Sequence, residues 1–355
     1  MKSKQDYCLF TTNGMFIIDK IVNKTKNTID IDVPGGGGLF STLGSTIVAT
    51  SENNLLRHNS PNLSKTIKFI IDCGKDFPNE IIKPMLDPWN VDVVYRYDES
   101  RLTTRGYNEY DGDYRIFRYE TPKLQIIADD ILSLSKKEIG MIHLICSPKR
   151  CHEILQGLKI DNGLYKCYNF VWEPTPDMCK LEYLADILSI LQFYNQKKGF
   201  NMTFSPNSEE FLQLITGELV IDPSLDLIKK VFFKNFEKLF FNHNHKYVIR
   251  CGKLGCLLYN NKLKKFTKYP AYHDDTTKDK IVDATGCGNS FIGAYATALV
   301  LTDFDYEIGC IFGNIASGIV LEQKGLPTLS KDSKMVPIWN KISFNERLDI
   351  YKNKL

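Results

Sequence analysis

Val282-Asp283-Ala284-Thr285-Gly286-Cys287-Gly288-Asn289-Ser290-Phe291 is the stretch that decides the fold of this chain. It leads into an apolar run that ends near Leu301, and this pattern predicts a long buried helix from Gly286. Glycines at positions 286 and 288 let backbone N–H groups approach an anion, and the helix N-terminus adds about half a positive charge. The stretch is neither a Walker loop nor a dinucleotide fingerprint, because it lacks Gly-Lys-Ser/Thr and carries Phe291 at the third glycine position. Alone, it indicates either a phosphate site or an ordinary glycine-rich helix start.

Composition and charge exclude several classes of protein. Of the 355 residues, 43% are hydrophobic and 25% are charged, which is typical of a folded globular protein and not of a disordered chain. Lys and Arg number 45 against 42 Asp and Glu. The net charge of +3 is too small for a general electrostatic grip on nucleic acid or on an anionic membrane. We therefore expect no direct nucleic-acid partner and no membrane partner.

The ten cysteines indicate a reducing compartment. They are scattered, mostly in apolar stretches, and the sequence contains no Cys-x-x-Cys pair. The first residues contain no apolar segment typical of a signal peptide. The most apolar stretch, residues 291–301, is far shorter than the ~20 residues of a transmembrane helix. The sequence therefore predicts a cytoplasmic protein.

Short apolar runs alternate with helical stretches along the chain. This alternation predicts an α/β fold in which a mainly parallel sheet is covered by helices on both faces. The expected strands lie at residues 6–10, 15–18, 67–72, 141–146, 169–172, 202–204 and 247–249. A helix is expected at residues 227–241, where phenylalanines at helical spacing predict core packing.

Two segments do not follow this alternation of strands and helices. Residues 29–33 read Ile-Asp-Ile-Asp-Val, and residues 91–119 alternate apolar and polar side chains, which is typical of half-exposed strands. We expect residues 29–34 and 91–119 to supply a small β lid, inserted in a core that spans residues 1–330. Residues 331–355 are predicted to form a tail with a short charged helix at 344–352.

Three motifs together resemble the ribokinase-like (PfkB) carbohydrate and nucleoside kinases. They are Pro34-Gly35-Gly36-Gly37-Gly38, Ser205-Pro206-Asn207-Ser208-Glu209-Glu210 and the stretch from Asp283 to Phe291, in the order and spacing of that family. The resemblance runs from about Phe10 to Leu329. It implies a ribokinase-like fold, with a mainly parallel sheet sandwiched by helices and a small β lid.

A fungal subgroup of this family shares further residues. Thr103-Thr104-Arg105-Gly106, the Gly-x-Gly-Asn-Ser-Phe form of the glycine motif and the ending Asn345-Glu346-Arg347-Leu348 resemble the maintenance-of-killer proteins. This resemblance implies a role in maintaining a double-stranded RNA killer virus of yeast, through its particles. Given the small net charge, we expect a protein partner for this role and not RNA.

The catalytic position of the glycine motif is altered. In family kinases the Asp that ends this motif accepts the proton of the substrate hydroxyl, while the preceding amides hold the γ-phosphate. The resemblance assigns the amides to Gly286, Cys287 and Gly288, and the base position to Asn289. An amide cannot accept that proton, and loss of a general base lowers the rate about 10²- to 10⁴-fold. Cys287 is either an oxidisable thiol with a lowered pKa or a small residue of the anion loop.

The substrate side is altered as well. Asp19 matches the Asp that grips a sugar hydroxyl, although a solvated loop carboxylate or a helix cap also explains it. Gly36 and Gly37 match the substrate-binding glycine turn, which simple turn chemistry also explains. Phe40 stands where family members commonly carry an Asn that binds substrate hydroxyls, and Phe cannot make that hydrogen bond.

The nucleotide side is better preserved. Asn207 and Glu210 match the Asn-x-x-Glu element that orders Mg²⁺ and phosphate through water, and ordinary helix capping also explains them. Arg250 is expected either near the nucleotide phosphates or on the surface. The resemblance further places Gly252 and Asn314 beside the nucleotide.

Two functions are compatible with these residues. The first, which we favour, is a nucleotide-binding but catalytically weakened kinase relative that binds ATP or ADP with Mg²⁺ and acts through protein contacts. The second is an active ATP-dependent kinase that phosphorylates a hydroxyl of a sugar or nucleoside, because a loose transition state demands little of a base. The resemblance adds a loop for a monovalent cation such as K⁺ at Asp283 and Thr285, and a homodimer through the lid.

Overall fold

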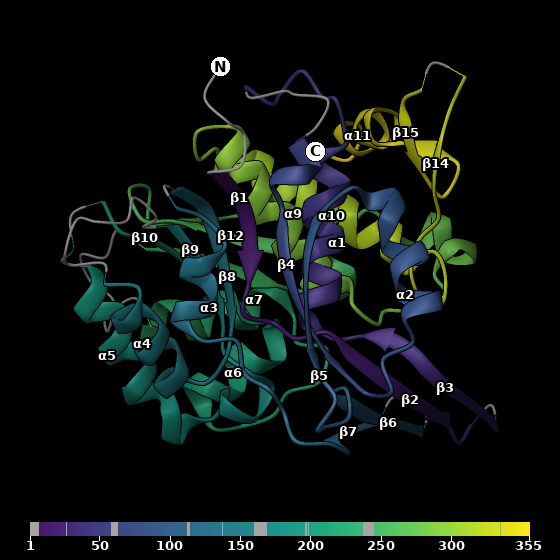
Figure 1. Cartoon of the computed structure of the whole chain (residues 1–355). Coiled ribbons are helices and arrows are strands. Elements are labelled where there is room, and N and C mark those ends of the chain that lie inside the picture. The colour runs from purple at the N-terminus through teal and green to yellow at the C-terminus, as the bar shows by residue number, and fades with distance from the viewer. Residues whose placement is uncertain are drawn as a thin grey trace.

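A seven-stranded sheet, in the order β1-β8-β9-β10-β11-β12-β13, runs through the centre of the molecule in the computed structural model (Figure 1). The structure describes residues 7–25, 27–57, 63–111, 114–136, 138–159, 169–195, 197, 199–236, 245–333 and 335–355. The first five strands in this order are parallel to one another, and β12 is antiparallel to both of its neighbours, β11 and β13. The strands are β1 (Tyr7–Thr12), β8 (Glu138–Ile145), β9 (Asn169–Glu173), β10 (Asn201–Phe204), β11 (Lys246–Arg250), β12 (Cys256–Asn260) and β13 (Lys265–Tyr269).

Helices cover both faces of this sheet (Figure 1). Neighbouring strand residues point to opposite faces, so that Val248 belongs to one hydrophobic cluster and Ile249 to the other. The first cluster includes α1 (Gly37–Ala49), α9 (Cys287–Leu301) and α10 (Tyr306–Leu321). The second includes α3 (Ala128–Ser133), α4 (Pro148–Gly157), α5 (Leu184–Asn195), α6 (Ser208–Thr216) and α7 (Leu225–Val231). The predicted mainly parallel sheet with helices on both faces is confirmed.

A parallel strand pair extends the sheet region beside β1. It consists of β4 (Lys68–Gly74) and β5 (Asp92–Asp98), and the bridge between Phe10 and Ile67 connects it to β1. Helix α2 (Asn79–Leu86) links the two strands. The prediction that residues 91–119 belong to the lid is therefore wrong for β5. Its alternating pattern arises because alternate side chains of β5, among them Val93 and Tyr95, pack against the main core.

A separate four-stranded sheet, in the order β3-β2-β6-β7, forms the lid (Figure 1, below the central layers). Its strands are β2 (Ile17–Asn23), β3 (Thr28–Gly35), β6 (Arg105–Asp111) and β7 (Tyr114–Tyr119). The small β layer expected from residues 29–34 is confirmed, whereas residues 17–18, expected in the central sheet, begin a lid strand. The lid presents Ile29 and Ile31, which are 64% and 67% exposed.

The last segment of the chain packs into the main core. It contains β14 (Leu329–Lys331), β15 (Pro337–Trp339), β16 (Ile342–Ser343) and α11 (Phe344–Lys352). Arg347, on α11, is fully buried and its Nη2 donates to Glu322 over 2.8 Å. Although burial opposes it, hydrogen bonds from His273 and Arg347 lower the pKa of Glu322 to about 2. This ion pair fixes α11 against the end of α10.

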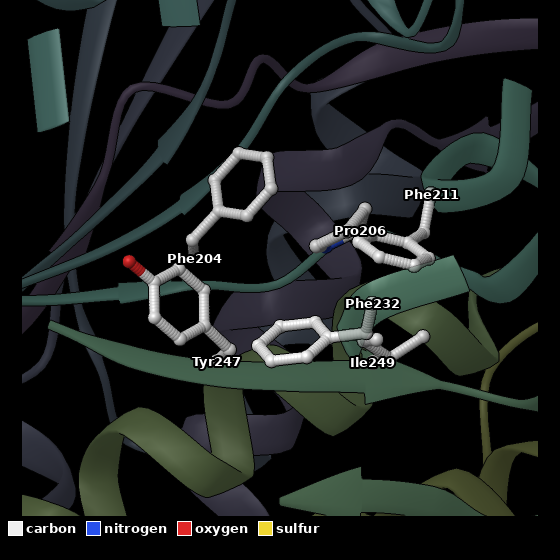
Figure 2. Close-up of a pocket in the computed structure, with 6 residues that line it drawn as sticks. All are labelled: Phe204, Pro206, Phe211, Phe232, Tyr247 and Ile249. Carbon is white, nitrogen blue, oxygen red and sulfur yellow. The ribbon is translucent and has the colours of Figure 1, made fainter. Parts of the chain in front are cut away.

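Aromatic side chains fill the core beneath α7. The helix expected at 227–241 is α7, followed by a π-helical turn over Phe232–Phe236, while residues 237–241 lie outside the described part of the chain. Figure 2 shows the ring of Phe232 between Tyr247 and Ile249, two residues of β11, in a small apolar pocket. Its lining residues are Phe204, Pro206, Phe211, Phe232, Tyr247 and Ile249. Phe232 is 1% exposed, so this aromatic residue packs in the core, as its spacing predicts.

No helix in the described ranges is both long enough and apolar enough to span a membrane. The longest, α10, has 16 residues.

Helices α1 and α9 cross in direct backbone contact. A methyl group on Gly44 would overlap the carbonyl oxygen of Ser290, and one on Gly293 would overlap that of Ser41. The hydroxyl groups of Ser45 and Thr297 are 2.6 Å apart across the same contact. Since only glycine lets the two backbones approach this closely, the crossing fixes both helices in one register.

We predict that Gly293→Ala destabilises the protein by about 1–3 kcal/mol, because the added methyl group cannot fit against a backbone carbonyl. The midpoint of urea unfolding would measure this loss. Gly309→Ala on α10 is the matched control, since its methyl group would meet side-chain atoms of Tyr295 at 2.9 Å and not the backbone. An equal or smaller loss for Gly293→Ala than for the control would contradict the close backbone contact.

Candidate functional site

The N-terminus of α9 opens at the carboxyl edge of the parallel strands. Gly286 precedes the helix with φ 82°, a conformation that favours glycine, and no side chain caps it. Within the described part of the chain, no hydrogen bond engages the amides of Gly288 and Asn289 in the first turn. Two unmatched N–H groups at a helix N-terminus can bind an anion.

Phe40 packs against this helix start. A methyl group on Gly286 would overlap the Phe40 ring, and Phe40 itself is only 4% exposed. Its carbonyl oxygen accepts a hydrogen bond from Ser290 Oγ over 3.0 Å. The structure therefore places Phe40 in the core between α1 and α9 and does not present it to a substrate.

Asn289, at the predicted base position, faces the N-terminus of α1. Its Oδ1 is buried and has no hydrogen-bond partner in the described residues. A methyl group on Gly37 would lie 3.1 Å from this oxygen, so the amide lies directly against the glycine turn. Gly36, with φ 96°, is the N-cap residue that precedes α1. The structure thus places Asn289 against Gly37, next to Gly36 in the chain, and the roles of these residues in catalysis and substrate binding stay predictions.

Asp19 lies in strand β2 of the lid and not in a loop. Its carboxylate occupies the space left by two glycines, because a methyl group on Gly35 or on Gly106 would overlap it. Asn108 Nδ2 donates to Asp19 Oδ1 over 3.0 Å, and Asp19 is 9% exposed. Asp19 is therefore a nearly buried carboxylate of the lid, positioned by Asn108, and it is neither a solvated loop residue nor a helix cap.

A chain of polar side chains connects the ends of the parallel strands. Gly14 N donates to Thr12 Oγ1, which lies 3.0 Å from His143 Nδ1. His143 Nε2 is 3.0 Å from Glu173 Oε1, and Glu173 Oε2 is 2.7 Å from Arg250 Nη2. The sequence analysis missed His143 and Glu173. The signal that could have found them is a polar residue at the end of an apolar strand, where ligands bind in open α/β sheets.

Arg250 reaches from β11 to the N-terminus of α9. An added methyl group on Gly288 would lie 2.5 Å from Arg250 Nη1, so the guanidinium covers this glycine. Arg250 Nη2 is also 3.7 Å from Glu210 Oε2. Burial raises the pKa of Glu210. Against the effect of burial, Arg250 and His143 hold the pKa of Glu173 below its usual value. Arg250 is thus part of the site and not a surface residue.

Asn207 and Glu210 cap α6 reciprocally. Glu210 N donates to Asn207 Oδ1 and Asn207 N donates to Glu210 Oε2, both over 2.8 Å. Because these atoms bind each other and a guanidinium cation lies beside Glu210, the residues do not fit a directly coordinated Mg²⁺ ion, and a role through water stays a prediction. In the described residues, no group of three or more His, Cys, Asp or Glu side chains could hold a metal ion.

The remaining predicted residues are placed as follows. Gly252 begins the exposed turn after β11, with open space around its Cα. Asn314 turns into the core, where its amide donates to Tyr351 Oη over 3.1 Å, so the structure does not bring it to the nucleotide side. Asp283 Oδ1 accepts the N–H of Thr285 over 2.9 Å, and a cation loop at these two residues stays a prediction.

Cys287 is packed at the helix start and is not an activated thiol. Burial and the nearby Asp283 carboxylate raise the pKa of Cys287 to about 12. Its Sγ lies 3.5 Å from the carbonyl oxygen of Ser317, whose Oγ donates to the Cys287 carbonyl over 2.6 Å. These contacts favour the interpretation of Cys287 as a small residue of the anion loop.

Comparisons with known proteins identify relatives of this chain. Residues 203–332 match the model of the pfkB family carbohydrate kinase. Protein MAK32 of Saccharomyces cerevisiae is 37% identical over 98% of this chain and 93% of its own length. An uncharacterized protein of Schizosaccharomyces pombe, C16C9.01c, is 30% identical over 96% of this chain and 92% of its own length.

Solved structures share the fold at low sequence identity. Ribokinase from Giardia lamblia has a TM-score of 0.63 at 18% identity, covering 98% of this chain and 99% of that one. A putative ribokinase II from Escherichia coli, in complex with ATP and Mg²⁺, has a TM-score of 0.59 at 13% identity, covering 98% and 100%. The predicted ribokinase-like fold is therefore confirmed.

We predict that iodoacetamide at pH 8 alkylates Cys287 at least about 100-fold more slowly in the folded protein than after unfolding in guanidinium. The thiolate is the reactive form, and a pKa of about 12 leaves almost none of it at pH 8, whereas an unfolded thiol titrates near 8.5. Peptide mass spectrometry would follow this residue separately from the other cysteines. Equal rates in the folded and unfolded states would show that Cys287 is accessible and reactive.

Proposed function

Because the chain belongs to the pfkB family of carbohydrate kinases, in the fungal group that includes protein MAK32, we propose that it binds ATP or ADP at the N-terminus of α9. The observation that carries this proposal is the pair of unmatched amides at Gly288 and Asn289, with the Arg250 guanidinium beside them. Amide N–H groups, a helix N-terminus and a guanidinium are all donors that suit phosphate oxygens. Gly252, in the exposed turn after β11, belongs to the same side of the site.

The bound nucleotide is turned over slowly. Asn289 lies where the resemblance places the catalytic base, and its side chain accepts hydrogen bonds but cannot take up a proton at neutral pH. Its buried Oδ1, which has no partner in the described residues, leaves an acceptor that suits a substrate hydroxyl or water. The chain is in this view a catalytically weakened kinase relative.

The role of such a protein lies in its contacts with other proteins. The resemblance to the maintenance-of-killer proteins supports a part in maintaining a double-stranded RNA killer virus through its particles. The net charge of +3 favours a protein surface over RNA as the direct partner. Ile29 and Ile31 give the lid an apolar exposed face, which supports a homodimer through the lid.

The alternative is an active kinase for a hydroxyl of a sugar or nucleoside. The observation that favours it is Asp19, whose carboxylate is held by Asn108 between two glycines. A carboxylate kept in place in this way is an acceptor for substrate hydroxyls. Positioning and electrostatics supply most of the rate in phosphoryl transfer, so an altered base does not by itself abolish turnover.

We predict that ATP and ADP stabilise the folded protein. Nucleotide at 100 times its dissociation constant adds about 2.7 kcal/mol to the free energy of unfolding. Thermal unfolding monitored by tryptophan fluorescence at increasing nucleotide concentration would measure the shift, with free adenosine as the control that lacks phosphate. A melting temperature unchanged at millimolar ATP and ADP would contradict nucleotide binding.

We also predict that Asn289→Asp increases phosphoryl transfer. The wild type should turn over more slowly than ~1 s⁻¹, the low end for kinases, on any sugar or nucleoside. The variant restores a base and should increase turnover by up to about 10²-fold on an acceptor that the site holds. The rate of ADP formation with a panel of sugars and nucleosides measures the turnover of the wild type and of the variant. Asn90→Asp, at an exposed position, is the matched control. Wild-type turnover above ~1 s⁻¹ would establish the active-kinase alternative.

A further inference from the structure

Arg250 brings a positive charge to the start of α9, between Gly288 and two carboxylates. Its side chain is only 13% exposed, and its guanidinium lies between the glycine-lined start of α9 and two carboxylates. Glu173 Oε2 lies 2.7 Å and Glu210 Oε2 3.7 Å from Arg250 Nη2. One fixed positive charge is therefore held by two acidic side chains beside the unmatched amides of Gly288 and Asn289.

The two carboxylates already have partners and do not form a free set of ligands for a divalent ion. Mg²⁺ requires oxygen ligands at about 2.0–2.1 Å in octahedral geometry. Glu210 Oε2 already accepts the Asn207 N–H, and Glu173 uses both oxygens, one toward His143 and one toward Arg250. A divalent cation in this position would also meet the like charge of the guanidinium. The cation that these carboxylates bind is the Arg250 guanidinium.

The protein does not use the whole hydrogen-bonding capacity of this guanidinium. Arg250 Nη2 faces the carboxylates, whereas Nη1 lies over Gly288, a residue of the first turn of α9. The Nε atom is buried and has no hydrogen-bond partner in the described residues. A planar guanidinium with donors on several edges can hold a carboxylate with one edge and phosphate with another.

We infer that Arg250 supplies, as a residue of the chain, the positive charge that Mg²⁺ would otherwise provide, so that the site binds the phosphates of a metal-free nucleotide. Glu173 acts as a positioning residue, because it holds Nη2 and thereby directs Nη1 toward Gly288. This inference rests on the proposed nucleotide binding and specifies the form of the ligand. It concerns binding alone and requires no phosphoryl transfer.

Titration calorimetry with ADP and with pyrophosphate, each in EDTA and in excess MgCl₂, tests the inference on the whole chain. We expect the dissociation constant of the wild type for ADP in EDTA to be no more than about threefold weaker than in MgCl₂. Tight binding that appears only with MgCl₂ would overturn the inference and leave the proposed nucleotide site intact. Binding of neither ADP nor pyrophosphate under any condition would overturn both. Pyrophosphate binding in EDTA without any ADP binding would support the anion site and contradict the nucleotide proposal.

Variants at position 250 separate the guanidinium from the helix N-terminus. Arg250→Thr should weaken binding of ADP in EDTA by about tenfold or more, which is the usual effect of losing a charged hydrogen bond. Arg250→Lys keeps the positive charge and should therefore weaken ADP binding less than Arg250→Thr does. Arg57→Thr is the matched control, because Arg57 forms an exposed ion pair with Asp303 beyond the opposite end of α9. Unchanged binding in a folded Arg250→Thr would overturn the inference. If that variant does not fold, the wild-type comparison in EDTA and MgCl₂ decides the question.

Discussion

The backbone contact between α1 and α9 is the constraint on which the rest of the site depends. Gly44 and Gly293 let the backbones of the two helices touch where they cross, and the N-terminus of α1 lies beside that of α9, since Asn289 contacts Gly37. Each N-terminus carries about half a positive charge, and two such ends side by side repel each other. The packing energy of the crossing offsets this repulsion, and an anion between the two ends would relieve it. The two helix N-termini therefore create a positive potential that favours a bound anion, even without any charged side chain.

Most of the architecture could be predicted from local sequence patterns. The helix after Gly286 begins within one residue of its expected position, because small residues before an apolar run mark a helix start in any context. The alternation at residues 29–34 predicts a lid strand, because a half-exposed strand alternates apolar and polar residues in any fold. Alternation shows that a strand is half-exposed but not which strand it pairs with, so β5 was assigned to the lid although it pairs with β4. Strand β2 was misplaced because its apolar start reads like a core strand.

The site was predictable only where the residues lie close together in sequence. Asn207 and Glu210 form one helix turn, and their spacing predicts the reciprocal cap, whereas the contact of Glu210 with Arg250 is visible only in the structure. His143 and Glu173 are 30 residues apart on two strands, and only the parallel pairing of β8 and β9 brings them together. Asn314 was assigned to the nucleotide because a motif gives a position along a helix, whereas packing decides which way the side chain turns.

The contact between Phe40 and Gly286 limits how this protein can change over evolutionary time. The ring fills the space where a Cβ on residue 286 would lie, so the two positions cannot vary independently. An Asn at position 40 would replace a buried ring with a smaller polar group, and truncations of buried Phe lose about 3–5 kcal/mol. That loss is a large share of the 5–15 kcal/mol that keeps a typical domain folded. A protein with Phe40 in this contact therefore cannot obtain a hydroxyl-binding side chain at position 40 by a single substitution that leaves its stability unchanged.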